Sequence, residues 1–151
     1  MAIDVTIEKS IARSPADVFE RVADVAAWPT WLIASGILRV ERSADASIAD
    51  GEHLVVEQRA AGRAGTFDAT VTAIQAPTRF AIRGRDQDGV SIEIDAALAP
   101  EGEGTHLRWS IRIGLPLRYR VFESMARPQV ERAAALDIEA LRLDMERATG
   151  D

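Results

Sequence analysis

The sequence predicts an α+β fold in which a curved antiparallel sheet of about six or seven strands packs against one long C-terminal helix. Three observations lead to this fold. Apolar and polar residues alternate in successive segments between residues 37 and 113, turn residues separate these segments, and the remainder repeats its apolar positions at helical spacing. The length of 151 residues fits a single domain, residues 1–151.

The N-terminal segment predicts one strand followed by two short helices. Ile3, Val5 and Ile7 alternate with polar residues, as in a half-buried strand. Ser14-Pro15-Ala16-Asp17 then supplies an N-cap, a proline suited to the first helical turn and a carboxylate for the positive helix end. Pro29 ends the first helix, and a short second helix precedes the run of strands.

The middle of the chain predicts about six strands, separated by turns. The turns lie at Asp50-Gly51, Ala61-Gly62, Ala76-Pro77, Asp88-Gly89 and residues 100–104. After Gly114 the pattern becomes helical, and Pro128 predicts either a kink or the restart of a second helix. Beyond it, one apolar stripe is expected to face the sheet, formed by Val130, Ala134, Ile138, Leu141 and Met145.

A single helix is too narrow to fill the hollow of a strongly curved sheet, because its diameter is about 10 Å. Several inward positions on the central strands carry only a methyl group, namely Ala69, Ala73 and Ala96. The sequence therefore predicts a cavity between sheet and helix.

Composition narrows the possible functions. The chain has no cysteine and a net charge of −6, with its arginines scattered among carboxylates. This argues against nucleic acid or an anionic membrane as the main partner, although not against a small local basic patch. No segment resembles a signal peptide or a membrane span, so we expect a cytoplasmic protein without stable membrane insertion. His53 and His106 are expected to face outward, and no metal or cofactor site is predicted.

The order of several short motifs resembles the START/Bet v 1-like (SRPBCC) superfamily, and within it the polyketide cyclase/dehydrase-like subgroup. The motifs are residues 14–19 (SPADVF), 27–29 (AWP), 50–51 (DG), 76–80 (APTRF), 104–109 (GTHLRW) and 137–141 (DIEAL). The resemblance implies the helix-grip fold, in which a curved antiparallel sheet wraps around a C-terminal helix. It also implies that Trp28 anchors the first helix to the sheet. For Trp31 two positions stay open, the cavity mouth or the core.

Aromatic-polyketide cyclases of this family carry a pocket arginine on the strand that corresponds to residues 66–74. Here that strand reads TFDATVTAI and holds no arginine, and residues 62–65 read as a hairpin turn. This difference counts against cyclase activity, because a cyclisation site needs placed donors and a tuned acid or base.

Three polar side chains are expected to reach the cavity and to orient a ligand: Gln58, Tyr119 and Asp137. Asp137 falls within the apolar arc of the last helix, where burial would raise the pKa of its carboxyl group. Asp137 and Tyr119 are therefore the candidate proton-transfer groups. The alternative for Asp137 is a structural role at the edge of the stripe, paired with a nearby arginine or water.

Three hypotheses follow. The first is a protein that binds a small hydrophobic, lipid- or polyketide-like molecule; the second is a cyclase/dehydrase-type enzyme that acts on such a molecule. The third is a cochaperone-like module, which predicts an exposed apolar patch and no usable cavity.

Leu136 and Leu143 lie toward the charged side of the last helix and suggest a possible homodimer contact. The expected ligand-binding residues are Trp31, Leu32, Leu54, Val56, Gln58, Phe67, Val71, Phe80, Ile82, Ile92, Ile94, Trp109, Ile111, Tyr119, Met125, Val130, Asp137 and Leu141.

Overall fold

The computed structural model describes residues 2–60 and 62–149, so Ala61, which the sequence places in a turn, lies outside the described residues. Within this part, seven strands form one sheet in the order β1-β7-β6-β5-β4-β3-β2, and all neighbours pair antiparallel. The predicted antiparallel sheet is thus confirmed. The strands are β1 (Ala2–Ile11), β2 (Ile37–Arg42), β3 (His53–Ala60), β4 (Arg63–Gln75), β5 (Arg79–Arg85), β6 (Ser91–Glu101) and β7 (Gly104–Gly114).

The two short helices after β1 and the long C-terminal helix are confirmed, but the prediction that Pro29 ends the first helix is wrong: that helix ends at Ala23, and Pro29 lies inside the second one. After β1 come α1 (Pro15–Ala23) and the 3₁₀ helix η1 (Val25–Thr30); after β7 come the 3₁₀ helix η2 (Leu117–Phe122) and the long helix α2 (Glu123–Thr149). Ser14 caps α1 as predicted, because its Oγ accepts a hydrogen bond from the backbone N–H of Asp17. α2 continues through Pro128, so the helix does not restart there.

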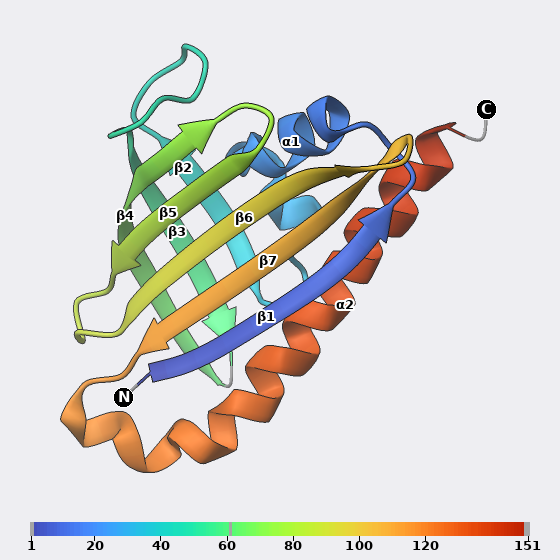
Figure 1. Ribbon diagram of the computed structural model, residues 1–151. Coiled ribbons are helices and arrows are strands. Elements are labelled where there is room, and N and C mark those ends of the chain that lie inside the picture. Colours follow the sequence, from blue (N-terminus) through green and yellow to red (C-terminus); the bar gives the residue numbers. More distant parts are fainter. Residues whose placement is uncertain (1, 61, 150–151) are drawn as a thin grey trace.

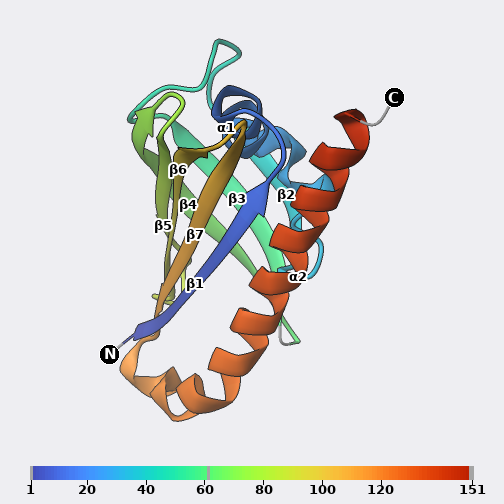
Figure 2. The same cartoon turned by 45° about the vertical axis from the view of Figure 1, so that its right-hand side comes forward.

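The sheet curves around α2, with α1 and η1 at one end and η2 at the other (Figures 1 and 2). Register shifts in the β2–β3 and β4–β5 pairs mark irregularities of the kind that bend a sheet. α2 runs beside β1, where Lys9 Nζ lies 3.1 Å from Glu139 Oε1, and Arg142 also binds the Glu139 carboxylate. These contacts fix the helix along one edge of the sheet.

The core lies toward the α1 end of the sheet. One face of the later part of α2 is buried there: Ala134, Ile138 and Leu141 are fully covered. The N-terminal end of the same helix is not, since Met125 is 62% exposed and the preceding Phe122 is 52% exposed. The helix therefore closes the hollow of the sheet at one end and leaves it less covered at the other.

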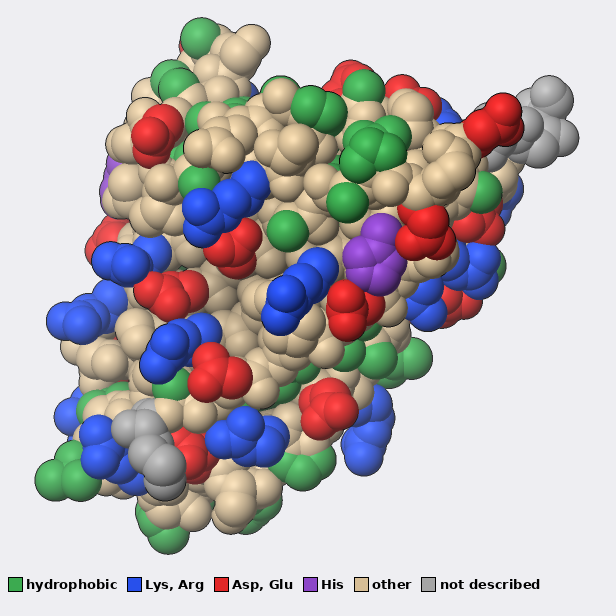
Figure 3. All heavy atoms as spheres, viewed as in Figure 1, with side chains coloured by type: hydrophobic (Ala, Val, Ile, Leu, Met, Phe, Trp, Pro, Cys, Tyr) green, Lys and Arg blue, Asp and Glu red, His purple; other side chains and the backbone are tan. Residues whose placement is uncertain are grey.

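The outer face of the sheet carries interspersed positive and negative side chains (Figure 3). Arg79 binds Asp95 and Arg83 binds Glu93, each pair linking β5 to β6. Ladders of this kind satisfy the charges of a solvent-facing sheet without any ligand.

Candidate functional site

A cavity of about 540 Å³ lies between the concave face of the sheet and the N-terminal half of α2. Strands, the loop after η1, η2 and α2 all contribute to it. Its apolar lining residues are Ile3, Leu32, Ala34, Ile37, Ala60, Phe67, Val90, Ile92, Ile94, Trp109, Ile111, Ile113, Leu115, Phe122, Ala126, Val130 and Ala133; Gly65 and the polar residues Ser35, Gln58, Arg63, Tyr119 and Gln129 complete the lining. The predicted cavity is therefore present.

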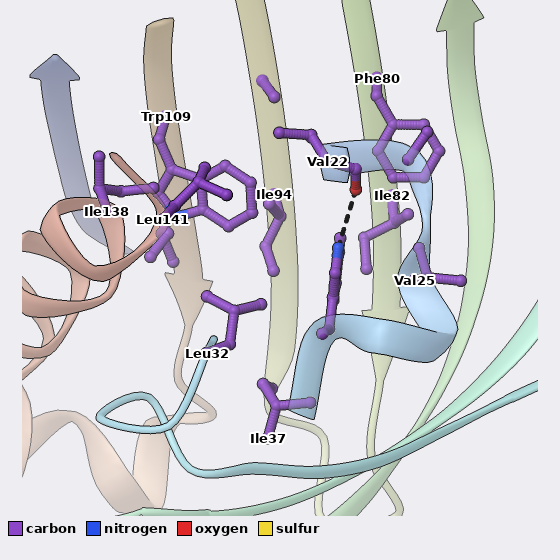
Figure 4. Close-up of a cluster of buried hydrophobic side chains, with 14 of the residues drawn as sticks. Val22, Val25, Leu32, Ile37, Phe80, Ile82, Ile94, Trp109, Ile138 and Leu141 are labelled. Carbon is purple, nitrogen blue, oxygen red and sulfur yellow. Dashed lines mark hydrogen bonds between the residues drawn. The ribbon is translucent and has the colours of Figure 1, made fainter. Parts of the chain in front are cut away.

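Tryptophans close the inner end of the cavity. Trp109 in β7 is fully buried and meets Trp28 and Trp31 edge to face, with ring centroids 6.0 and 5.5 Å apart. Trp28 is anchored by its Nε1, which donates to the carbonyl of Val22 at 2.8 Å (Figure 4). The AWPTWL stretch thus turns two indole rings into the core, and Trp31, only 2% exposed, belongs to the core rather than to the mouth.

The opposite end of the cavity is polar and partly open. Arg63, at the start of β4, donates from Nη2 to Asp86 and Asp88, at 2.6 and 2.7 Å. The hydrogen bond to Asp86, whose side chain is almost fully buried, raises the pKa of Arg63. The Tyr119 ring lies near two guanidinium groups, 4.8 Å from that of Arg118 and 5.9 Å from that of Arg63. The guanidinium of Arg63 and the phenol of Tyr119 thus lie together at the cavity mouth.

Asp137 holds a loop of the cavity wall in place and does not line the cavity itself. Its two carboxylate oxygens accept the backbone N–H groups of Ala34 and Ser35, each at 2.8 Å, and Gln58 Nε2 donates to the Ser35 carbonyl, also at 2.8 Å. Burial raises the pKa of Asp137, although the hydrogen bonds that it accepts favour the ionised form. Asp137 therefore ties the loop that follows η1 to α2; Ala34, Ser35 and Gln58 line the cavity, and Asp137 does not.

The loop also approaches β3 closely at Gly36. Its φ is +75°, and a Cβ at this position would lie 1.9 Å from the carbonyl oxygen of Arg59. The backbone N–H of Arg59 in turn donates to the Gly36 carbonyl at 2.9 Å. Only glycine fits this contact, which sets the position of Ser35 in the cavity wall.

Comparison with known proteins agrees with this architecture. Residues 2–146 match the family described as "Polyketide cyclase / dehydrase and lipid transport". The chain belongs to this family. A comparison with curated protein sequences gave no significant match.

Several solved structures have the same fold as this protein, although their sequence identity to it is low. A START superfamily protein from Mycobacterium smegmatis is 17% identical, with a TM-score of 0.79 over 96% of this chain and 98% of that one. The Zhui aromatase/cyclase from Streptomyces sp. R1128 is also 17% identical, with a TM-score of 0.78 over 99% and 96%. The protein TTHA0849 from Thermus thermophilus is 15% identical, with a TM-score of 0.78 over 97% and 99%. At these identities the likeness establishes the helix-grip fold.

Half of the ligand-binding residues that the sequence predicts for this protein line the cavity. Those in the lining are Leu32, Gln58, Phe67, Ile92, Ile94, Trp109, Ile111, Tyr119 and Val130. Seven others are buried in the core outside the lining: Trp31, Leu54, Val56, Val71, Phe80, Ile82 and Leu141. Met125 points to solvent, and Asp137 binds the loop.

Arg63 is the main residue that the sequence analysis missed. The expected strand began at residue 66, whereas β4 begins at Arg63, so the expectation of a strand without arginine is wrong. The signal was available: Phe67 faces inward, and the same parity continues through Gly65 to Arg63. Reading residues 62–65 as a turn hid this pattern.

No group of three His, Cys, Asp or Glu side chains within residues 2–60 and 62–149 is arranged to hold a metal ion. In the same part of the chain, every helix falls short of the length or apolar character that a bilayer span requires.

Proposed function

We propose that this protein binds a small hydrophobic molecule, lipid- or polyketide-like, in the cavity between the sheet and α2. The observation that carries the proposal is the shape and polarity of the cavity: about 540 Å³, closed by apolar and aromatic side chains at one end and polar at the mouth. This volume falls within the roughly 300–1,000 Å³ of small-molecule sites. A cavity of this size also favours ligand binding over a module that acts only through its surface.

The polar mouth supports a ligand with an oxygen acceptor at one end. Among the described residues, the hydrogen bonds of Arg63 come from Nη2, which leaves Nε and Nη1 without a partner. Gly65 keeps the space beside Nη1 open, because a Cβ there would lie 3.2 Å from that atom. Tyr119 and Gln129 add donors nearby. A carbonyl, phenol or carboxyl group would fit at this end, with the apolar body against Ile94 and Trp109.

The first experiment is native mass spectrometry of the freshly purified protein, followed by analysis of its denatured organic extract. A bound hydrophobic compound released on denaturation is the expected result. Its mass gives the ligand class, and its stoichiometry is expected to be one per chain. A ligand-free protein would shift the test to the probe experiment.

The probe experiment measures binding of the fluorescent dye anilinonaphthalene sulfonate to two variants. Ala126→Trp places an indole in the cavity lining, and Ala140→Trp places the same group on an exposed position of the same helix. We expect Ala126→Trp to weaken dye binding at least about tenfold, because the indole would fill part of the cavity volume that the dye needs. Equal binding by both variants would exclude the cavity as the dye site and contradict the proposal.

The alternative function is a cyclase/dehydrase-type enzyme acting on such a ligand, and the pairing of Arg63 with Tyr119 at the mouth favours it. A guanidinium can orient a carbonyl, and a phenol can donate a proton to it. With the extracted compound as substrate, Tyr119→Phe would then abolish conversion while leaving the affinity nearly unchanged. Absence of conversion by the wild-type protein would leave binding as the function.

A further inference from the structure

Four apolar side chains protrude into solvent on the short stretch 117–125, which we call the rim segment. It comprises η2 and the first turn of α2. Leu117 is 80% exposed, Val121 76%, Phe122 52% and Met125 62%. Their spacing of four, one and three residues places them on one side of a helical segment. Large apolar groups that share one exposed surface mark an interaction site.

The rim segment is also positively charged, in contrast to the whole chain. The chain carries a net charge of −6, but residues 117–125 contain two arginines and one glutamate. Both arginines, Arg118 and Arg120, are exposed beside the apolar side chains, and Arg118 also donates to the carbonyl of Asp88. On the outer face of the sheet the charges are interspersed and paired, so this local excess is a distinct feature (Figure 3).

The position of the rim segment connects it to the cavity. Tyr119 and Phe122 line the cavity, while their neighbours Leu117 and Val121 point away from it. The segment lies at the end of the sheet opposite α1 (Figures 1 and 2). A ligand that passes through the mouth therefore passes beside these exposed apolar groups.

We propose that the rim segment docks on the surface of an anionic lipid bilayer. Its apolar side chains would enter the boundary between headgroups and acyl chains, and its arginines would bind the anionic headgroups. Of the four apolar side chains, Phe122 also lines the cavity, whereas Leu117, Val121 and Met125 lie outside the lining and are available to a lipid surface. This inference goes beyond ligand binding, because docking of the rim segment would place the cavity mouth against the lipid bilayer.

The test is co-flotation of the full-length protein with vesicles in a density gradient. One vesicle type is phosphatidylcholine alone, and the other is an equimolar mixture of phosphatidylcholine and phosphatidylglycerol. We expect binding to the mixed vesicles, tighter than to the neutral ones by about fivefold for each arginine at the surface.

Two matched pairs of variants locate the contact. Val121→Asp is expected to weaken vesicle binding about tenfold or more, whereas Leu143→Asp, on the distant part of α2, leaves it unchanged. Arg120→Glu is expected to weaken it at least about fivefold, whereas Arg108→Glu, on the outer sheet face, leaves it unchanged.

Two outcomes would overturn the proposal. One is absence of binding to the mixed vesicles, which would leave the rim segment as a contact for an acidic protein. The other is equal weakening by the rim variants and their controls. Dye binding in the cavity, measured on the same samples, should be unchanged in Val121→Asp, because Val121 lies outside the lining. Failure of vesicle binding is therefore distinguishable from failure of ligand binding.

Discussion

Replacing Asp137 by alanine tests the role that the structure gives this carboxylate. Asp137 is 2% exposed, and it accepts two hydrogen bonds from the loop that follows η1. A buried donor left without its acceptor costs about 1–3 kcal/mol. Two such donors would cost about 2–6 kcal/mol, and relief of the buried charge offsets part of this cost.

We therefore expect Asp137→Ala to lower the free energy of unfolding by about 2–4 kcal/mol. For a chain of this length, this corresponds to a fall in Tm of between about 4 and 16 °C. Thermal and urea unfolding, followed by circular dichroism, would measure both quantities. Disturbance of the loop also predicts weaker dye binding, because Ala34 and Ser35 line the cavity.

Asp144→Ala is the matched control, since it removes the same side chain seven residues further along α2. Asp144 binds Arg21, and both side chains are at least a third exposed. Ion pairs of this kind contribute about 0.2–1 kcal/mol, so the control should change Tm only slightly. Equal destabilisation by the two substitutions would refute the assigned role of Asp137.

The pH dependence of the same variant gives a second test. Burial raises the folded-state pKa of Asp137 above the ordinary value of 3.8, so the ionised form reduces stability at neutral pH. This reduction disappears as the pH falls through the folded-state pKa toward 3.8. The stability difference between wild type and Asp137→Ala should therefore widen on acidification. A difference that narrows would mean that the hydrogen bonds outweigh burial.

Three further outcomes are expected. Gly36→Ala should lower the free energy of unfolding by more than about 2 kcal/mol, because its Cβ would collide with Arg59; calorimetry would show this as a lower Tm, and an unchanged Tm would contradict it. Glu139→Gln should lower Tm at neutral pH, with the difference vanishing as the pH falls from 4.5 toward 2, because Arg142 and Lys9 lower the pKa of Glu139 to about 2. If the chain forms a homodimer through the exposed Leu136 and Leu143, sedimentation should show a dimer that Leu136→Asp converts to monomer; a wild-type monomer would exclude this contact.

The fold was predictable because its signals are local. Alternation in strands such as β6 and β7 fixes which face is buried, and glycine or proline marks the turns between them. The capped start of α1 at Ser14 follows from four consecutive residues. Each of these features depends on neighbours in the chain, so one sequence is enough to find it.

The site was harder to predict because its key contacts join distant segments. Asp137 binds backbone groups of residues 34 and 35, about a hundred positions away, and a backbone N–H leaves no trace in the sequence. Met125 follows the helical pattern, but it precedes the part of α2 that the sheet covers, so periodicity alone misplaced it. Arg63 was missed through a strand boundary, the least certain part of any sequence-based assignment.

The polar clusters around Asp137 and around Arg63 differ in how many of their hydrogen-bonding atoms have a partner in the protein. This difference suggests a structural role for the first cluster and a ligand-binding role for the second. In one cluster, the loop engages both Asp137 oxygens and Nε2 of Gln58, so this cluster is formed without a ligand. In the other, Asp86 and Asp88 occupy only Nη2 of Arg63 and hold the guanidinium in place while its remaining edge stays available. The loop in the cavity wall is held by Asp137, and the Arg63 guanidinium is oriented with donors that have no partner among the described residues. Such an arrangement is preorganised for a ligand. We propose that Arg63 selects the ligand: its replacement by glutamine should change ligand preference, and it should also lower stability, because it removes the ion-pair partner of the buried Asp86.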